Sequence, residues 1–333
     1  MAYSVVLLAC LVFCAGALAV ERQVPTHLPE LRATTALRII DGDVVPSPNP
    51  YPWAVSLTFG CSDNPQAQFQ CAGSLIQSNV VLTAAHCWDF DCEATPWGIA
   101  TTGLDRTDPD EGLRVLGKVT HPGYNPNTLS DDIAFWVMDG EFQNVGTFAS
   151  LPTGNIRESA KVTIAGWGLT ENGRSSQVLL RAGVEVQPDA TCGQLFPQTY
   201  REDTQLCAGT DGGGKDSCNG DSGGPLFTTG DGCAQLEGLT SYGSPDCGSL
   251  DGAVYTRIIA YVGWIEATMA EVGVERNSPG SCSTSNNSIG LIIGIVVGVI
   301  LVVIIVIAIV VMRSRSKESP SKAGAGGYRP AVF

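Results

Sequence analysis

The segment Gly220-Asp221-Ser222-Gly223-Gly224-Pro225 places one serine among glycines. Glycine allows a backbone to turn sharply and to approach a ligand closely, because it carries no Cβ. Read alone, such a segment is more often a Gly-rich turn than a reactive site. Two earlier segments have to be explained together with it: Thr83-Ala84-Ala85-His86-Cys87 and Ser130-Asp131-Asp132-Ile133-Ala134.

The three segments supply the residue types that activate a serine. A hydroxyl is a weak nucleophile, so an imidazole must accept its proton, and a buried carboxylate must hold that imidazole in one tautomer. Taken one at a time, each residue has an ordinary structural interpretation: His86 as a core histidine, Asp132 as a turn residue and Ser222 as part of a glycine-rich turn. Jointly, in the order His, Asp, Ser, they predict nucleophilic catalysis.

From Ile39 to about Val272 the chain resembles the chymotrypsin and trypsin family of serine proteases on these three segments. The resemblance implies an all-β fold of two six-stranded antiparallel Greek-key barrels with a C-terminal helix. It implies a catalytic triad of His86, Asp132 and Ser222, with the backbone N–H groups of Gly220 and Ser222 as the oxyanion hole. Asp132 is preferred over Asp131 because the family's aspartate directly precedes an Ile-Ala pair. No cofactor and no metal are implied.

The resemblance also implies a substrate class. The family's P1 pocket has an aspartate six residues before the serine, which is Asp216, followed here by Ser217. A buried carboxylate favours a cationic partner, so we expect protein or peptide substrates with Arg or Lys at P1. The pocket walls are expected from Ser241, Tyr242, Gly243 and Ala253. Ala253 stands where Gly is usual and Tyr242 where Trp is usual, which leaves the preference between Arg and Lys open.

The sequence Arg38-Ile39-Ile40-Asp41-Gly42 resembles the family's activation site. Cleavage after Arg38, by another protease or by the enzyme itself, is expected to free the Ile39 ammonium to pair with Asp221. Residues 20–38 are then the activation propeptide. A buried ion pair of this kind acts better as a switch than as a source of net stability.

The cysteines fit an exported protein. Ten of the twelve lie beyond the predicted signal, an even number that favours disulfides over zinc, since the chain has only three histidines. The resemblance implies the pairs Cys71–Cys87, Cys192–Cys207 and Cys218–Cys247. Cys61 and Cys92 flank the histidine segment and are expected to pair, and Cys233–Cys282 remains by elimination.

Two apolar segments direct the chain to a membrane. Residues 1–19 form a predicted secretory signal peptide. Residues 289–312 carry no charge and exceed the roughly 20 residues that a helix needs to span a bilayer. Basic residues in the tail, 313–333, put it in the cytosol by the positive-inside rule, which predicts a single-pass type I protein contacting membrane lipid, in the plasma membrane. A removable lipid-anchor signal is the alternative interpretation.

Composition and patterning complete the organisation. A net charge of −14 excludes nucleic acid as an expected partner. Short apolar runs separated by Gly, Pro, Asn and Asp, such as 53–59, 79–84, 161–165 and 235–241, predict antiparallel strands from 39 to about 252. A helix over 260–272 is expected to close the domain, and a stalk, 273–288, to follow it. A catalytically dead homologue used for binding and a receptor that signals through its tail are the alternatives to an active endopeptidase.

Overall fold

The computed structural model describes residues 39–90, 92, 96–107, 112–143, 145–230 and 233–274. Its strands and helices, in chain order, are β1 (Asp43–Val44), β2 (Ala54–Cys61), β3 (Asn64–Gln77), β4 (Val80–Thr83), η1 (Ala85–Trp88), β5 (Pro96–Thr101), β6 (Gly112–Thr120), β7 (Ala134–Met138), β8 (Lys161–Gly166), β9 (Leu180–Val186), α2 (Asp189–Leu195), β10 (Gln205–Gly209), β11 (Pro225–Gly230), β12 (Cys233–Tyr242), β13 (Ala253–Arg257), η3 (Ile258–Tyr261) and α3 (Val262–Glu271).

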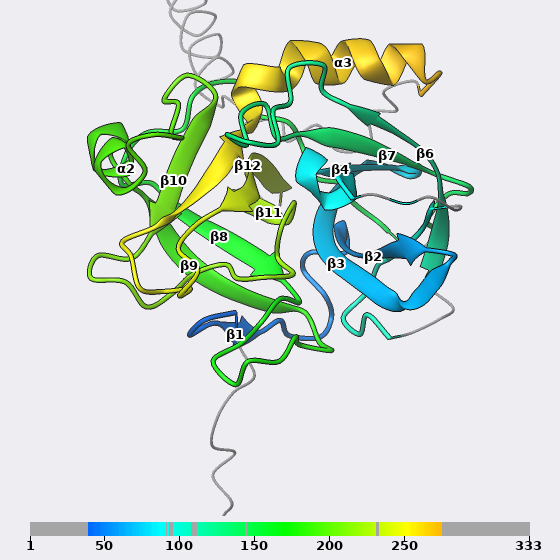
Figure 1. Ribbon diagram of the computed structural model, residues 1–333, viewed down its shortest axis with the longest axis horizontal. Coiled ribbons are helices and arrows are strands. Elements are labelled where there is room, and N and C mark those ends of the chain that lie inside the picture. The colour runs from blue at the N-terminus through cyan, green and yellow to red at the C-terminus, as the bar shows by residue number, and fades with distance from the viewer. Residues whose placement is uncertain are drawn as a thin grey trace, which may run out of the picture. The chain divides into compact units, whose positions relative to one another are not determined.

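The first six long strands close into a barrel in the order β2-β3-β4-β7-β6-β5 (Figure 1). Consecutive strands β2, β3 and β4 pair as hairpins, and β5 returns to lie beside β2, which is the Greek-key connection. All of these pairings are antiparallel. Closure removes the open strand edges that would otherwise need a partner.

The second barrel repeats this plan with β8, β9, β10, β13, β12 and β11, and the β8–β9 pairing closes it. Here β11 returns beside β8, so the Greek key recurs, and the short strand β1 pairs antiparallel with β9. Strand β9 shows why the sequence closes this way: Leu180, Ala182, Val184 and Val186 are buried, while the residues between them are not. Alternation of this kind points every second side chain into a barrel.

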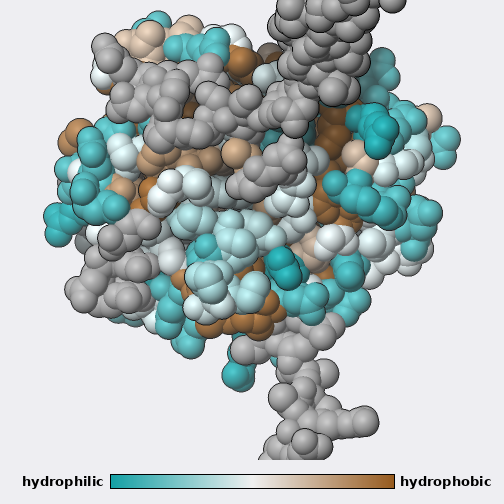
Figure 2. All heavy atoms as spheres, turned by 180° about the vertical axis from the view of Figure 1, so that it is seen from behind, coloured by the Kyte–Doolittle hydropathy of each residue, from teal (hydrophilic) through white to brown (hydrophobic). Residues whose placement is uncertain are grey.

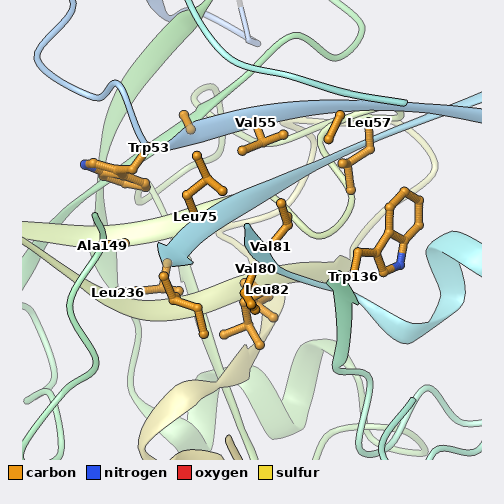
Figure 3. Close-up of a cluster of buried hydrophobic side chains, with 14 of the residues drawn as sticks. Trp53, Val55, Leu57, Leu75, Val80, Val81, Leu82, Trp136, Ala149 and Leu236 are labelled. Carbon is orange, nitrogen blue, oxygen red and sulfur yellow. The ribbon is translucent and has the colours of Figure 1, made fainter. Parts of the chain in front are cut away.

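One large cluster of buried side chains fills the first barrel and continues into neighbouring strands. Figure 3 shows Trp53, Leu75 and Leu82 of this cluster beside Leu236 of β12. Each fully buried large apolar side chain contributes about 1.5–3 kcal/mol relative to an exposed one. The cluster therefore holds strands of both barrels together and fixes the segments at the barrel ends.

Helix α3 follows the short helix η3, so the helix expected over 260–272 begins as a 3-10 turn. Ile265, Thr268 and Met269 are its buried residues. The face in Figure 2 is largely hydrophilic or neutral, with apolar patches between the polar residues.

No helix among the described residues has the length and hydropathy needed to cross a membrane. The predicted signal peptide (1–19), propeptide (20–38), membrane helix (289–312) and tail (313–333) lie outside the described residues.

Candidate active site

Strand pairing brings His86 and Asp132 together. Strand β4 pairs with β7 so that Thr83 lies opposite Ala134, and the chain continues from these two ends into η1 and back into the Asp132 loop. His86 Nδ1 and Asp132 Oδ2 are 2.7 Å apart, and the His86 backbone N–H donates to Asp132 Oδ1 at 2.9 Å. A carboxylate only accepts, so Nδ1 carries the proton and Nε2 is left as the basic nitrogen of the neutral ring.

Asp132 is held from the second barrel as well. Ser241 Oγ donates to Asp132 Oδ2 at 2.6 Å, and Thr256 Oγ1 donates to the Asp132 carbonyl at 2.8 Å. The carboxylate is thus buried and fully hydrogen-bonded. Burial alone would lower the pKa of His86, but the charge and hydrogen bond of Asp132 outweigh burial, and the pKa is raised.

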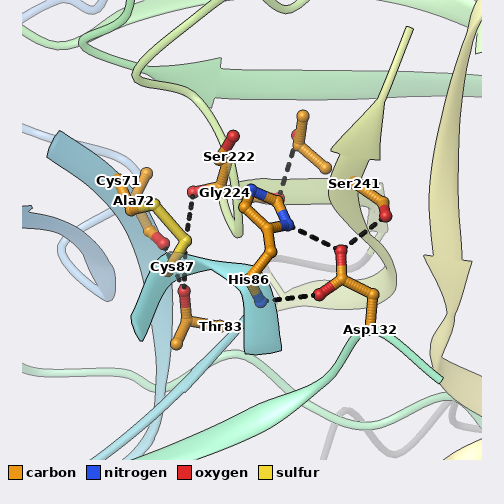
Figure 4. The surroundings of a disulfide bond; sticks show 10 residues. Cys71, Ala72, Thr83, His86, Cys87, Asp132, Ser222, Gly224 and Ser241 are labelled. Carbon is orange, nitrogen blue, oxygen red and sulfur yellow. Dashed lines mark hydrogen bonds and ion pairs between the residues drawn. A yellow bond between two sulfur atoms is a disulfide. The ribbon is translucent and has the colours of Figure 1, made fainter. Parts of the chain in front are cut away.

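The turn that carries Ser222 is fixed by glycines and by strand β3. Gly220 and Gly223 have φ of 95° and 74°, a region that other L-residues rarely adopt. A Cβ at Gly223 would lie 2.1 Å from Thr83 Oγ1, so no larger residue fits there. The Ala72 N–H donates to the Ser222 carbonyl at 2.8 Å. In Figure 4 the His86 ring lies between Asp132 and the Ser222 segment.

Disulfides brace both sides of this site. The structure contains four of the five expected pairs: Cys61–Cys92, Cys71–Cys87, Cys192–Cys207 and Cys218–Cys247. Cys71–Cys87 joins β3 to the turn after His86, and Cys218–Cys247 joins the loop before Ser222 to the segment after β12. Cys233 is also disulfide-bonded, and its expected partner, Cys282, lies outside the described residues.

A cavity of about 70 Å³ opens beside Ser222. It is lined by Ser217, Cys218, Asn219, Ser222, Thr240, Ser241, Tyr242, Gly243, Cys247 and Ala253. The expected pocket residues Ser217, Ser241, Tyr242, Gly243 and Ala253 are therefore together in one lining. A Cβ placed on Gly243 would lie 3.1 Å from the Ala253 Cβ. The cavity is therefore narrow between these two lining residues.

Asp216 lies next to this lining, adjacent in sequence to Ser217, and its side chain is almost fully buried. Its Oδ2 accepts the Gly248 N–H at 2.8 Å, but its buried Oδ1 has no hydrogen-bond partner among the described residues. Burial raises the pKa of Asp216 to about 6, against the opposing effect of the Gly248 and Ser217 backbone N–H groups. An ionised carboxylate here lacks the partner that burial demands.

Asp221 is the second buried acid of the same loop. Its carboxylate accepts the N–H of Gly168 at 2.7 Å and that of Cys218 at 3.0 Å. Burial raises the pKa of Asp221 to about 7, although these two N–H groups lower it. Ile39 is itself fully buried and packs in the core of the second barrel, and Ile40 forms a β-bridge with Asp216.

Comparison with known proteins identifies the family. The sequence profile of the family described as Trypsin matches residues 39–265. The chain belongs to the trypsin family. It is a serine-type endopeptidase of that family.

Three relatives illustrate the likeness. The chain is 32% identical to kallikrein-4 of Homo sapiens over 235 residues, which cover 70% of this chain and 87% of the relative. It is 33% identical to kallikrein-14 of Homo sapiens over 227 residues, 66% of this chain and 80% of the relative. It is 30% identical to cathepsin G of Mus musculus over 256 residues, 75% of this chain and 93% of the relative.

In this trypsin-family protease the sequence did not indicate two of the groups that contact Asp132. Ser241 was expected only as a pocket wall, and Thr256 was not singled out. Their bonds to Asp132 connect residues more than a hundred positions apart, 109 and 124. No spacing or periodicity in the sequence signals such pairs.

Among the described residues, two clusters of side chains come close enough to suggest a metal site, Cys71 with His86 and Cys87, and Cys61 with Asp63 and Cys92. In both clusters the two sulfurs are joined in a disulfide. A disulfide sulfur is not the thiolate that binds metals. Neither cluster of this trypsin-family chain offers a metal a suitable set of ligands.

Proposed function

We propose that this trypsin-family protease cleaves after Arg or Lys through a Ser222–His86–Asp132 triad. The observation that carries the triad is the His86–Asp132 pair, whose hydrogen bonds fix the tautomer and leave Nε2 basic. In the proposed mechanism Ser222 Oγ attacks the scissile carbonyl while His86 Nε2 takes its proton. His86 then protonates the leaving amine, and water hydrolyses the acyl-enzyme by the same route.

The Gly220 and Ser222 backbone N–H groups are the proposed oxyanion hole. They belong to one tight turn, which the positive φ of Gly220 allows. Donors held by the backbone need no reorganisation when charge develops on the carbonyl oxygen. Losing one such donor typically costs about 3–4 kcal/mol of transition-state stabilisation.

Selectivity for a cationic P1 side chain is inferred from Asp216. Its Oδ1 is buried without a hydrogen-bond partner in the described part of the chain, and burial raises its pKa to about 6. A guanidinium or ammonium group would stabilise the ionised carboxylate, whereas a neutral side chain would leave it desolvated and alone. Ala253 narrows the cavity against Gly243, which favours the slimmer Lys side chain over the planar guanidinium of Arg.

Activation by cleavage at Arg38-Ile39 is the second part of the proposal. Asp221 is completely buried, accepts two backbone N–H groups of the surrounding loops, and has its pKa raised to about 7. A new Ile39 ammonium would compensate the Asp221 charge and set the turn that holds the oxyanion-hole donors. A Cβ at Gly168 would lie 2.5 Å from the Asp221 carboxylate, so glycine is needed beside this acid.

The disulfides are typical of a protein of the secretory pathway. We propose that residues 289–312 anchor the enzyme as a single-pass type I membrane protein with the catalytic domain outside the cell. The support is the uncharged length of this segment and the basic residues that follow it.

The experiment uses the full-length precursor purified in detergent. It is cleaved after Arg38 by an added protease, the new Ile39 terminus is checked by N-terminal sequencing, and peptide amides with Arg, Lys or Phe at P1 are assayed. We expect activity on Arg or Lys only after cleavage, and none in the Ser222→Ala variant. Cleavage of the Phe peptide alone would refute the proposal that Asp216 selects a cationic P1 side chain. Full activity before cleavage would refute the proposal that the uncleaved chain is an inactive precursor.

A further inference from the structure

A single buried glutamine, Gln205, connects Tyr242, which lines the cavity, to the segment that leads into Asp132. It begins β10, and its side chain is 2% exposed. Its Oε1 accepts the Tyr242 hydroxyl at 3.3 Å, and its Nε2 donates to the Leu129 carbonyl at 3.2 Å. One amide group thus reaches the end of β12 in the second barrel and the Asp132 loop of the first.

The backbone of Gln205 is itself held firmly. Its N–H donates to the Arg201 carbonyl at 2.8 Å, and its own carbonyl accepts Arg257 Nε at 2.9 Å. Its Oε1 also accepts the Arg201 N–H at 2.8 Å. A side chain anchored at this many points loses little further entropy when it binds its neighbours, so it is suited to holding them in place.

Both partners of the Gln205 amide need a specific contact. The half-buried Tyr242 ring packs edge-on against Phe196, with centroids 5.5 Å apart, and a tyrosine hydroxyl in such a position usually finds a hydrogen-bond partner. Leu129 has φ of 52°, a conformation unfavourable for a leucine, which persists only where the surroundings hold it. The Gln205 amide bonds to both residues: it accepts the Tyr242 hydroxyl, which also shares a hydrogen bond with the Thr199 side chain, and it donates to the Leu129 carbonyl.

One partner of the Gln205 amide lines the cavity, and the other lies in the segment before Asp132. Ser241, Tyr242 and Gly243 form one wall of the cavity beside Ser222. A substrate with its P1 side chain in the cavity therefore lays its preceding residues along the end of β12. Leu129 lies three residues before Asp132, which Ser241 contacts directly. The Gln205 amide thus joins a wall of the cavity to the segment that leads into Asp132.

We propose that Gln205 is a positioning residue that sets how strongly this enzyme selects extended peptides, by fixing Tyr242 and the Leu129 segment as walls for the residues preceding P1. The proposal rests on the cavity beside Ser222 being the P1 pocket of the proposed function. Under this proposal Gln205 affects how tightly the substrate residues before P1 bind. It does not take part in the reaction at Ser222, which the triad performs.

The test compares two activated substrates with the same P1 residue and leaving group, a single-residue amide and a tetrapeptide amide. The quantity measured is the ratio of their kcat/KM values in the activated full-length enzyme. In Gln205→Met, which keeps the volume and removes all three side-chain hydrogen bonds, to the Tyr242 hydroxyl, the Leu129 carbonyl and the Arg201 N–H, we expect this ratio to fall about tenfold, mainly through KM of the tetrapeptide. Tyr242→Phe removes one hydroxyl and should give part of the fall, and the double variant should be no worse than Gln205→Met.

The matched control is Gln235→Met. Gln235 also carries a hydrogen-bonded amide, whose Nε2 donates to Glu237 at 3.0 Å, but it does not line the cavity. Its ratio should equal that of the wild type. If both substrates lose activity equally in Gln205→Met and in Tyr242→Phe, or if the ratio stays constant in both, the proposal is wrong.

The same substrate pairs are prepared with Phe at P1. If the wild type cleaves Phe and not Arg, the proposed specificity fails, but the ratio for Gln205→Met is still measured on the Phe pair. Should Gln205→Met fail to fold in a thermal unfolding assay, Tyr242→Phe, which adds no bulk, decides the question alone. A tetrapeptide advantage that survives loss of the Tyr242 hydroxyl would then overturn the proposal.

Discussion

Replacing Asp216 by Asn should remove the preference for a cationic P1 side chain. The two side chains have nearly the same shape, so the substitution changes mainly the charge. Asn can still accept the Gly248 N–H that now binds Oδ2. Any change in activity therefore reports the carboxylate charge rather than the packing of the pocket.

The size of the effect follows from the pKa of Asp216. Burial raises it from the ordinary value of 3.8 to about 6, which at about 1.36 kcal/mol per pKa unit is about 3 kcal/mol. This free energy measures how poorly the empty pocket tolerates the ionised carboxylate. A substrate cation that restores the ionised form can recover much of it, so kcat/KM for an Arg substrate should fall about a hundredfold in Asp216→Asn.

The pH dependence gives an independent readout with a defined sign. Below about pH 6 the carboxyl is mostly protonated and attracts no cation, and above it the carboxylate binds Arg. The ratio of kcat/KM for an Arg peptide to that for a neutral P1 peptide should therefore rise with pH through about 6 in the wild type. The titration of His86 affects both peptides and cancels in the ratio. In Asp216→Asn the ratio should be low and independent of pH.

Stopped assays on matched peptide amides across pH 5–8 would measure this ratio. Asp246→Asn is the matched control, because Asp246 is an exposed acid on the segment after β12 and the charge change is the same. A loss on Arg peptides below about fivefold would equal only an exposed ion pair and would refute the role of Asp216. The same conclusion follows if the pH dependence of the ratio persists in the variant.

Two further substitutions test the pocket wall and the activation switch. Ala253→Gly removes the methyl that faces Gly243, and should raise kcat/KM for Arg relative to Lys by about tenfold; an unchanged or lower ratio would contradict the inferred width of the pocket. The Asp221→Asn variant should still be cleaved to an Ile39 terminus, but its kcat should fall about 10²–10³-fold, the cost of a misplaced oxyanion-hole donor. Active-site titration and amide hydrolysis would measure this loss. Wild-type activity in the cleaved variant would refute the proposed pairing of Ile39 with Asp221.

Sequence reasoning reached the barrels through local patterns. The strands expected at 53–59, 79–84, 161–165 and 235–241 correspond to β2, β4, β8 and β12 within two residues at each end. Alternation of buried and exposed residues, clear in β9, is a signal that a sequence carries directly. Strand order is not such a signal, and the two Greek keys were expected only through the resemblance on the three segments that contain His86, Asp132 and Ser222.

The site was harder to predict where it depends on contacts between the barrels. The sequence predicted that His86, Asp132 and Ser222 form one site, because each of them lies in a short distinctive segment. It did not indicate that Ser241 and Thr256 bind Asp132, or that Gln205 binds Tyr242 and Leu129. These partners are set by how β10, β12 and β13 pack against the first barrel, and side-chain hydrogen bonds between distant strands leave no periodic trace in the sequence.

The two buried acids of the loop before Ser222 act on each other. The charge of Asp216 contributes to the raised pKa of Asp221, so an uncompensated carboxylate at either position disfavours ionisation of the other. In the proposed enzyme each acid meets a cation from outside the loop, the P1 side chain at Asp216 and the Ile39 ammonium at Asp221. Neutralising one charge then makes the other easier to form, and the coupling is the same in both directions. In the proposed enzyme, binding of an Arg or Lys substrate would therefore favour the activated arrangement of the loop, and insertion of the Ile39 terminus would favour binding of the cation.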